Sequence, residues 1–216
     1  MKNKVWINVL IFLFIIVGLS KSAQWEDWEL GGEMGLGVGS GSKSGKILCP
    51  SLTITGTRTI DEKFLELGLG YLFGSDTEIN YTTEELERTD VYDPNVRRDV
   101  EKEVKIRLSV IPMTFNFHYT IYESFYIGAG IGLYHVFYKK EPLGDWRAEP
   151  DSEPGEVVKY PATTVLGFQQ MVGMEIFPMS ENWNWFVGIK SFVTTSAVET
   201  GGLMGISLGG KVRYTW

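Results

Sequence analysis

The sequence has little of several residue types on which other protein classes depend. It contains one cysteine, Cys49, which excludes an intrachain disulfide. Basic residues are outnumbered, because 20 Lys and Arg face 27 Asp and Glu, and the formal net charge is −7. An acidic chain lacks the basic face that nucleic-acid phosphates require. Nucleic acid is therefore excluded as an expected partner.

Long apolar runs are also missing after the first residues. The chain begins MKNKVWINVLIFLFIIVGLS, with two lysines ahead of the apolar run 5–17. This run is shorter than the roughly 20 residues of a membrane-spanning helix, and its flanks are typical of a secretory signal peptide. We predict a signal-peptide helix at 1–23, cleaved after Ser20 or Ala23, with the secretion translocon as partner. Removal of the two lysines changes the net charge from −7 to −9.

No helix-period segment of useful length follows, and the chain instead alternates with a period of two. In GISLGGKVRYTW, apolar side chains at even positions alternate with Lys211 and Arg213 at odd positions. This period is typical of a β-strand with one apolar and one polar face. The pattern recurs in FLELGLGYLF and FYIGAGIGLYHVF. It predicts eight strands, at 28–40, 47–59, 63–74, 103–121, 125–138, 163–177, 184–194 and 203–216.

The connections between these strands alternate in length. Short ones fall at 60–62, 122–124 and 178–183, and long, charged ones at 75–102 and 139–162. Ten-residue strands with short turns on one side and long loops on the other are typical of transmembrane β-barrels. We therefore predict an all-β, eight-stranded antiparallel up-and-down transmembrane barrel over 24–216, with external loops at 75–102 and 139–162. The alternating TEINYTT stretch is a candidate extension of the third strand.

Alternation alone does not say which face points outward, since a soluble eight-stranded barrel encloses its apolar residues. The aromatic residues favour the membrane orientation, because they gather at both ends of the strands as rings do at membrane–water interfaces. We predict an apolar outer face with interfacial rings. They are Trp28, Tyr122, Phe125, Trp183 and Trp185 near the short turns, and Tyr134 and Tyr138 near the long loops.

This orientation encloses charged residues in the lumen. An eight-stranded barrel is only wide enough to be filled by side chains, so the enclosed charges must pair. Across the seam between the first and last strands, Glu29 and Glu33 are expected to meet Arg213 and Lys211. Lys105 and Arg107 are candidates to join them through a bulge at Pro112. The predicted ion-pair network comprises Glu29, Glu33, Glu66, Glu175, Lys190, Lys211 and Arg213.

These stretches, with IPMTFNFHY and GFQQMVGMEIF, resemble the small outer-membrane β-barrels of bacteria, the OmpA-transmembrane and OmpW-like group. The final KVRYTW is similar to the C-terminal signal that such proteins present to the β-barrel assembly machinery, with Val212, Tyr214 and Trp216 as its outward stripe. The resemblance implies a bacterial outer-membrane location, with outer-membrane lipid and lipopolysaccharide as partners. The sequence departs from the bipartite members of this group, since we identify no periplasmic peptidoglycan-binding domain in it, and it carries no recognisable ligand motif, so no cofactor is predicted.

Three functions follow from this reading. The favoured one is a non-enzymatic structural or surface-interaction barrel whose lumen is plugged by ion pairs. The alternative is an OmpW-like channel for small, apolar molecules. The third, a lipid A-modifying enzyme, is disfavoured because inward His118 and lipid-facing His135 lack the serine nucleophile of the His–Ser constellations in lipid A deacylases and palmitoyltransferases. No catalytic, cofactor or metal residue is predicted.

Overall fold

The computed structural model describes most of the chain after the first 27 residues. The described ranges are 28–41, 45–60, 63–85, 97–122, 124–144, 153, 155–180, 182–195 and 202–214. The predicted signal peptide, its cleavage sites and Trp216 lie outside them, so these three points stay predictions. Within these ranges, no helix is long and apolar enough to cross a membrane.

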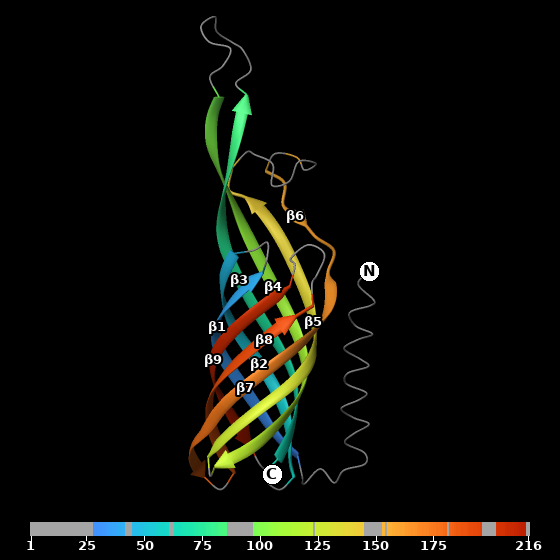
Figure 1. The fold of residues 1–216 in the computed structure, drawn as a ribbon, viewed down its shortest axis with the longest axis vertical. Coiled ribbons are helices and arrows are strands. Elements are labelled where there is room, and N and C mark those ends of the chain that lie inside the picture. The colour runs from blue at the N-terminus through green and yellow to red at the C-terminus, as the bar shows by residue number, and fades with distance from the viewer. Residues whose placement is uncertain are drawn as a thin grey trace, which may run out of the picture.

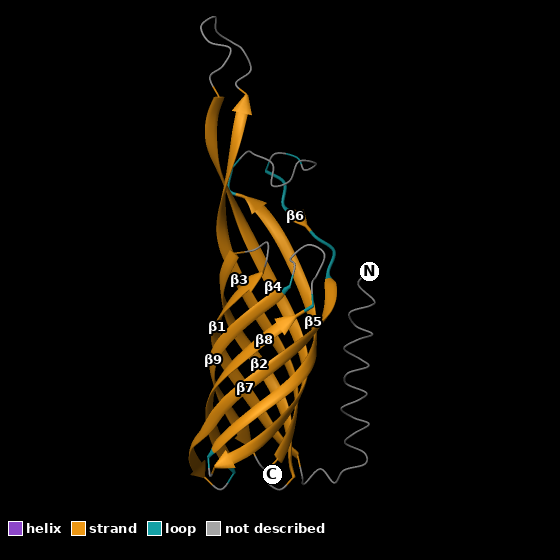
Figure 2. Cartoon of the chain, viewed as in Figure 1, coloured by secondary structure: helices purple, strands orange, loops and turns teal. Residues whose placement is uncertain are grey.

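The alternating segments form the walls of a barrel (Figures 1 and 2). Its eight strands are β1 (Trp28–Gly41), β2 (Gly45–Ile60), β3 (Lys63–Glu85), β4 (Arg97–Tyr122), β5 (Phe125–Pro142), β7 (Thr163–Ser180), β8 (Trp183–Thr194) and β9 (Leu203–Tyr214). The short strand β6 (Val158–Lys159) pairs with β5 only. Neighbours pair in the order β4-β3-β2-β1-β9-β8-β7-β5, and β4 pairs with β5. The barrel is therefore closed, without a free sheet edge around its wall, and the predicted fold is confirmed.

The apolar side chains of the alternating pattern point outward. Exposed residues occur on all eight barrel strands, and they include Leu30, Leu36, Ile54, Phe117, Ile131, Leu166, Ile189 and Ile206. A soluble monomer rarely exposes a continuous apolar surface of this extent, whereas a membrane barrel requires one. The predicted orientation is confirmed.

The strands on one side of the barrel are longer than the sequence pattern indicated. β3 has 23 residues and β4 has 26, and they stay paired from Gly74↔Leu108 to Glu85↔Arg97. β4 also pairs with β5 as far as Val104, so the two-stranded part, the ribbon, runs from Ile79↔Glu103 to Glu85↔Arg97. At about 3.3 Å per residue, this ribbon extends roughly 20 Å, and it projects beyond the other strands in Figure 1. The predicted loop over 75–102 is therefore wrong at both ends, because 75–85 and 97–102 are strand, while its middle, 86–96, lies outside the described residues. The extension of the third strand through TEINYTT is confirmed.

The second predicted loop, 139–162, is also partly ordered as sheet. β5 continues to Pro142, and β6 pairs with it at Lys139 and Lys140. The backbone N–H of Tyr160 donates to the carbonyl of Tyr138 at 3.1 Å. Sheet pairing therefore replaces the first and last parts of the predicted loop.

The predicted bulge at Pro112 is wrong. The β4–β5 register is continuous from Val104↔Pro142 to Thr120↔Tyr126, and it shifts only between Thr120 and Tyr122. Alternation therefore carries through the proline, which places Ile106 and Leu108 inside and Arg107 outside. Near the short turns, the apolar residues of β4 stand at odd, outward positions. Toward the long loops, they stand at even, inward positions, because the inward face of the strand is apolar there.

Candidate functional site

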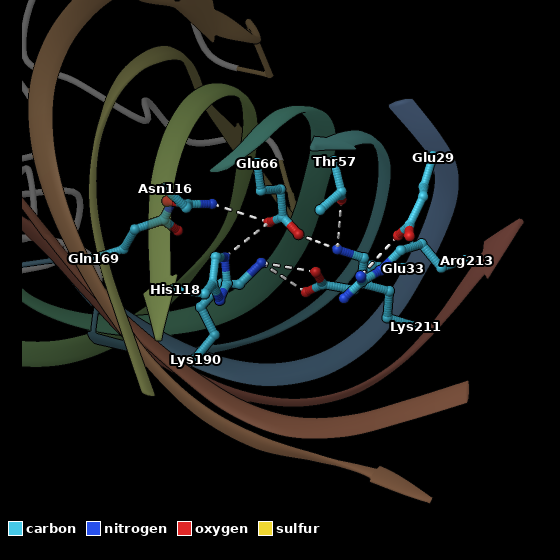
Figure 3. A network of polar contacts seen from close by, with 10 residues as sticks. All are labelled: Glu29, Glu33, Thr57, Glu66, Asn116, His118, Gln169, Lys190, Lys211 and Arg213. Atoms are coloured by element: carbon cyan, nitrogen blue, oxygen red, sulfur yellow. Dashed lines mark hydrogen bonds and ion pairs between the residues drawn. The ribbon is translucent and has the colours of Figure 1, made fainter. Parts of the chain in front are cut away.

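The lower lumen, near the short turns, is filled by charged and polar side chains centred on Glu66 (Figure 3). Glu66 is buried, with 2% of its surface exposed. One carboxylate oxygen accepts a hydrogen bond from Asn116 Nδ2 at 3.0 Å, and the other accepts one from Lys211 Nζ. Lys211 also reaches Thr57 Oγ1 at 3.4 Å. A buried carboxylate is tolerated only with such partners.

A second ion pair lies beside the first. Lys190 Nζ on β8 donates to both carboxylate oxygens of Glu33 on β1, each at 2.8 Å. β8 and β1 are separated by β9 in the wall, so this pair spans the inner face of one intervening strand.

The third pair closes the lumen toward the short turns. Arg213 Nη1 donates to Glu29 Oε2 at 2.7 Å. The guanidinium carbon lies 4.8 Å from the ring centroid of Phe64 and 4.1 Å from that of Phe186. Arg213 thus combines a charge-assisted hydrogen bond with two cation–π contacts. We call the six residues Glu29, Glu33, Glu66, Lys190, Lys211 and Arg213 the ionic layer.

The structure brings together six of the seven predicted network residues, with partners that differ in part from the prediction. Glu29 meets Arg213 across the β1–β9 seam as expected. Glu33 and Lys211 are cross-strand neighbours in register, yet each pairs with a residue farther around the barrel. Glu175 makes no ion pair with another described residue, and it lies at a register shift between β7 and β8. The remaining three acids balance the three bases.

Lys105 and Arg107, the two further candidates, lie outside the lumen. Arg107 Nη2 is 2.5 Å from Glu141 Oε2 on the outer surface. The odd positions of β4 point outward from Glu103 to Tyr119. The expectation that these cations join the lumen network is therefore wrong.

Sequence reasoning missed the neutral members of the network. Gln169 Nε2 on β7 donates to Asn116 Oδ1 on β4 at 2.5 Å, and Asn116 in turn binds Glu66. The signal was present, because the alternation places both amides at inward, buried positions of β4 and β7. Alternation fixes the face of such a residue, but its contact across the barrel depends on the strand stagger.

Glycines make room for the larger inward groups. A Cβ on Gly130 would lie 1.9 Å from Asn116 Oδ1 and 2.5 Å from the carbonyl oxygen of Phe115. A Cβ on Gly173 would lie 2.4 Å from the hydroxyl oxygen of Tyr126. Each of these two glycines therefore lies beneath a polar or aromatic side chain, which fills the space that a side chain at the glycine would need.

Toward the long loops, the lumen is filled by apolar residues instead. Tyr134 stacks on Phe192 with ring centroids 5.5 Å apart, and Tyr138 packs against Tyr160 at 5.1 Å. We call this buried cluster the apolar layer. It comprises Ile47, Cys49, Ile106, Leu108, Val110, Tyr134, Val136, Tyr138, Val165 and Leu203.

Both layers are closely packed. A cavity of about 20 Å³ remains beside Glu33, Glu66 and Lys211, and one of about 10 Å³ remains beside Cys49 and Phe192. A cavity of this size holds about one water molecule.

The predicted interfacial aromatic residues have different surroundings at the two ends of the barrel. Tyr122, Phe125, Trp183 and Trp185 are exposed at the short-turn end, as expected of interfacial rings. Trp28 begins β1 at the same end. Tyr134 and Tyr138 are buried in the apolar layer, so their prediction as interfacial residues is wrong. They stand at even positions of β5, which point inward along the whole strand.

The C-terminal strand has the predicted outward stripe as far as it is described. Val212 pairs in register with Gly32 and Trp185, and Tyr214 pairs with Leu30 and Trp183. The rings of Tyr214 and Trp183 lie 4.9 Å apart. The recognition of this stripe by an assembly machinery stays a prediction.

The two histidines occupy different surroundings. His118 lies inside, as predicted, stacked on Phe64 at 4.3 Å with Nε2 3.7 Å from Glu66 Oε1. His135 lies on the outward set but is buried, and its Nδ1 is 2.8 Å from Thr164 Oγ1. The outward position agrees with the predicted lipid-facing set, although neighbouring side chains cover the ring. Among the described contacts, neither histidine meets a serine hydroxyl.

The completed geometry is similar to that of solved outer-membrane barrels. The chain matches Neisserial surface protein A with a TM-score of 0.51 and 13% identity, over 88% of this chain and 97% of that one. The fold is that of a small outer-membrane β-barrel. Ail, the attachment invasion locus protein of Yersinia pestis, matches with a TM-score of 0.48 and 9% identity, over 87% of this chain and 97% of that one. The N-terminal barrel domain of Pseudomonas aeruginosa OprF matches with a TM-score of 0.38 and 13% identity, over 85% and 97%.

No protein-family model and no curated protein matches the sequence. The barrel fold and the apolar outer surface together make the chain an integral outer-membrane protein. The OmpA-transmembrane or OmpW-like membership within this fold stays a prediction.

Proposed function

We propose that this outer-membrane barrel is a sealed, non-enzymatic surface protein that displays the β3–β4 ribbon. The filled lumen is the observation that carries the proposal. An ionic layer with three balanced ion pairs blocks the lower half, and an apolar layer blocks the upper half. Cavities of about 20 and 10 Å³ between these side chains are far too small for a conducted solute.

Electrical recording from the purified protein in planar lipid bilayers tests the seal. We expect insertion without reproducible unitary current steps. The matched variant is the double substitution Glu66→Ala/Lys211→Ala, which removes the central ion pair and widens the lower lumen. Reproducible unitary steps from the unaltered protein would overturn the proposal. Steps that are confined to the double variant would support it, because they identify the ionic layer as the barrier.

We assign the interaction with surface partners to the β3–β4 ribbon. β3 and β4 form a paired hairpin up to Glu85 and Arg97, where they have no further barrel neighbour among the described residues. In an outer-membrane barrel, long connections face the cell exterior and short turns face the periplasm. The ribbon would thus stand clear of the membrane and present a surface to partners.

Labelling with a membrane-impermeant maleimide on intact cells tests this placement. The chain has a single, buried cysteine, so a Cys49→Ser background removes the native thiol. We expect a Thr82→Cys probe in the ribbon to react on intact cells. A Ser124→Cys probe in the short turn should react only after lysis. Reaction of the Ser124 probe alone on intact cells would reverse the proposed orientation.

An OmpW-like passage for apolar molecules is a second candidate that one observation favours. The β2–β3 pairing runs only to Ser51↔Leu72, and beyond this point Phe73 and Leu108 line both the inner apolar cavity and an outer groove. Such a notch would offer a lateral route. The apolar layer would have to open first. Uptake of a fluorescent hydrocarbon by vesicles with and without the barrel separates this candidate from a sealed protein.

The remaining partners belong to the same proposal. The β-barrel assembly machinery would recognise the final strand by pairing with its outward stripe, and the secretion translocon would recognise the signal peptide. Outer-membrane lipid and lipopolysaccharide would surround the apolar belt.

A further inference from the structure

The outer wall of the barrel is hollowed between β2, β3 and β4. The groove has a volume of about 590 Å³. It begins where the hydrogen-bonded pairing of β2 and β3 ends, beyond Leu72. The notch arises because β3 follows β4 into the ribbon while β2 stays paired with β1.

The lining of the groove changes from apolar to basic along the barrel. Its membrane-side part is formed by Leu48 and Pro50 of β2 and by Tyr71 and Phe73 of β3, whose rings stack 5.9 Å apart. Leu48 is 57% exposed, so this apolar surface is open. An apolar recess on the wall of a membrane barrel is suited to an acyl chain.

The rim of the groove toward the ribbon carries two cations, Lys105 and Arg107 of β4. Their charges point outward, and the side chain of Arg107 is 52% exposed despite its contact with Glu141. Lys139 pairs in register with Arg107, and Glu103 lies one outward position beyond Lys105. Among the side chains that the structure describes here, the outward charges are therefore three bases and two acids. The two groove cations lie nearest to the apolar recess.

We propose that this groove binds a phosphorylated lipid of the outer leaflet, with its phosphate at Lys105 and Arg107 and an acyl chain against Leu48, Pro50 and Phe73. This inference rests on the proposed orientation, in which the ribbon end faces outward. Charge complementarity selects an anionic headgroup, and the apolar recess below the cations selects a lipid over free phosphate. The side chain of Arg107 would exchange its carboxylate partner for the phosphate.

Native mass spectrometry of the full-length mature barrel tests the proposal. The barrel in detergent is titrated with bis-phosphorylated lipid A and with the dephosphorylated lipid that carries the same acyl chains. We expect a one-to-one adduct with the phosphorylated lipid and weaker retention of the other. Each of Lys105→Gln and Arg107→Gln should weaken retention about five-fold. Lys63→Gln, the same charge change at the opposite end of the wall, should leave retention unchanged.

The Glu141→Gln variant separates recognition from structure. If Arg107 acts through its ion pair alone, Glu141→Gln should weaken lipid retention as much as Arg107→Gln does. If Arg107 binds phosphate, Glu141→Gln frees the guanidinium, and retention should stay the same or rise. Equal losses in the two variants would overturn the proposal, and so would full retention in the Lys105→Gln/Arg107→Gln double variant.

The acyl-chain part has its own matched pair. Leu48 in the groove and Leu208 on β9, two strands away from β2, are 57% and 59% exposed, and both point outward. Leu48→Ser should weaken retention, whereas Leu208→Ser should not. Displacement of the lipid by inorganic phosphate alone would identify a free-anion site and overturn the lipid assignment.

Each variant is first checked for a folded barrel by its heat-dependent gel migration. The outcome is independent of the sealed-lumen proposal, since conductance is recorded separately. Current steps with intact lipid retention would reject the seal alone. A silent barrel that does not discriminate between the lipids would reject the groove alone.

Discussion

The two halves of the lumen are filled by side chains of opposite polarity. Near the short turns, Glu66, Lys211 and Asn116 form a hydrogen-bonded layer, and the outer face carries residues such as Phe115 and Phe117. Near the long loops, Ile106 and Leu108 of the same strand β4 point inward. The comparison shows that a single strand reverses its inside and outside chemistry along its length.

The solvent outside the wall explains the reversal. Where the wall faces hydrocarbon, its outward side chains must be apolar, and the polar side chains of the same strands point into the lumen. Where β3, β4 and β5 continue beyond the other strands, the outward positions carry Lys105, Arg107 and Lys139. Apolar side chains are then enclosed, as in a soluble barrel. The ribbon end is thus stabilised by burial of apolar surface, and the short-turn end by matched charges.

The largest loss of stability is expected for Lys211→Met, in the ionic layer. This change leaves the Glu66 carboxylate buried without its cation, and loss of one partner of a buried pair costs about 3–5 kcal/mol. The free energy of unfolding in detergent, measured by guanidinium titration, reports the loss. Glu66→Gln/Lys211→Met removes both charges and should recover most of it. Equal stability of the single variant and the unaltered barrel would contradict the role of the pair.

A smaller effect is expected for Arg213→Ala at the outer edge of the ionic layer. The variant loses the hydrogen bond to Glu29 and the contacts with Phe64 and Phe186, at a cost of about 2 kcal/mol. The unfolding temperature of the folded barrel in detergent should fall. Glu29→Gln keeps the ring contacts and should cost less than Arg213→Ala. The pairing is refuted by an unchanged unfolding temperature in both variants.

Gly130→Ala tests how closely the inward layer is packed. The added methyl would meet Asn116 Oδ1 and the fixed carbonyl of Phe115, so we expect a loss of about 1–2 kcal/mol from overpacking. Gly32→Ala is the control, because Gly32 points outward and no described atom lies within 4 Å of the methyl position. It should leave stability unchanged. Equal stability of the two variants, measured by the same titration, would indicate that the lumen has spare volume.

The sequence was sufficient to predict the eight barrel strands, their antiparallel order and the outward face. It was sufficient because a period of two assigns each residue to one face, as it does for Glu66 and Leu208. Strand ends were less predictable. The stretch that follows TEINYTT is charged, and charge density is equally typical of a solvated loop and of a ribbon outside the membrane.

Contacts across the lumen were only partly predictable. The seam pair Glu29–Arg213 follows from barrel closure, which makes β1 and β9 neighbours. The partners of Glu33 and Lys211 depend on stagger and side-chain reach, which no local pattern contains. Tyr138 was misplaced for another reason, because an aromatic residue at a strand end is equally suited to an interface and to a lumen.

The smallest effect is expected for Tyr134→Phe in the apolar layer, and it is the counterpart of Lys211→Met. The hydroxyl of Tyr134 is buried and has no hydrogen-bond partner among the described residues. Removal of the hydroxyl leaves the stacking on Phe192 in place. It also removes the desolvation penalty of a buried polar group, so the free energy of unfolding should be unchanged or slightly raised. The same guanidinium titration measures it. A loss of more than about 1 kcal/mol would mean that the hydroxyl has a partner, such as a bound water, and that polar contacts also stabilise the upper half.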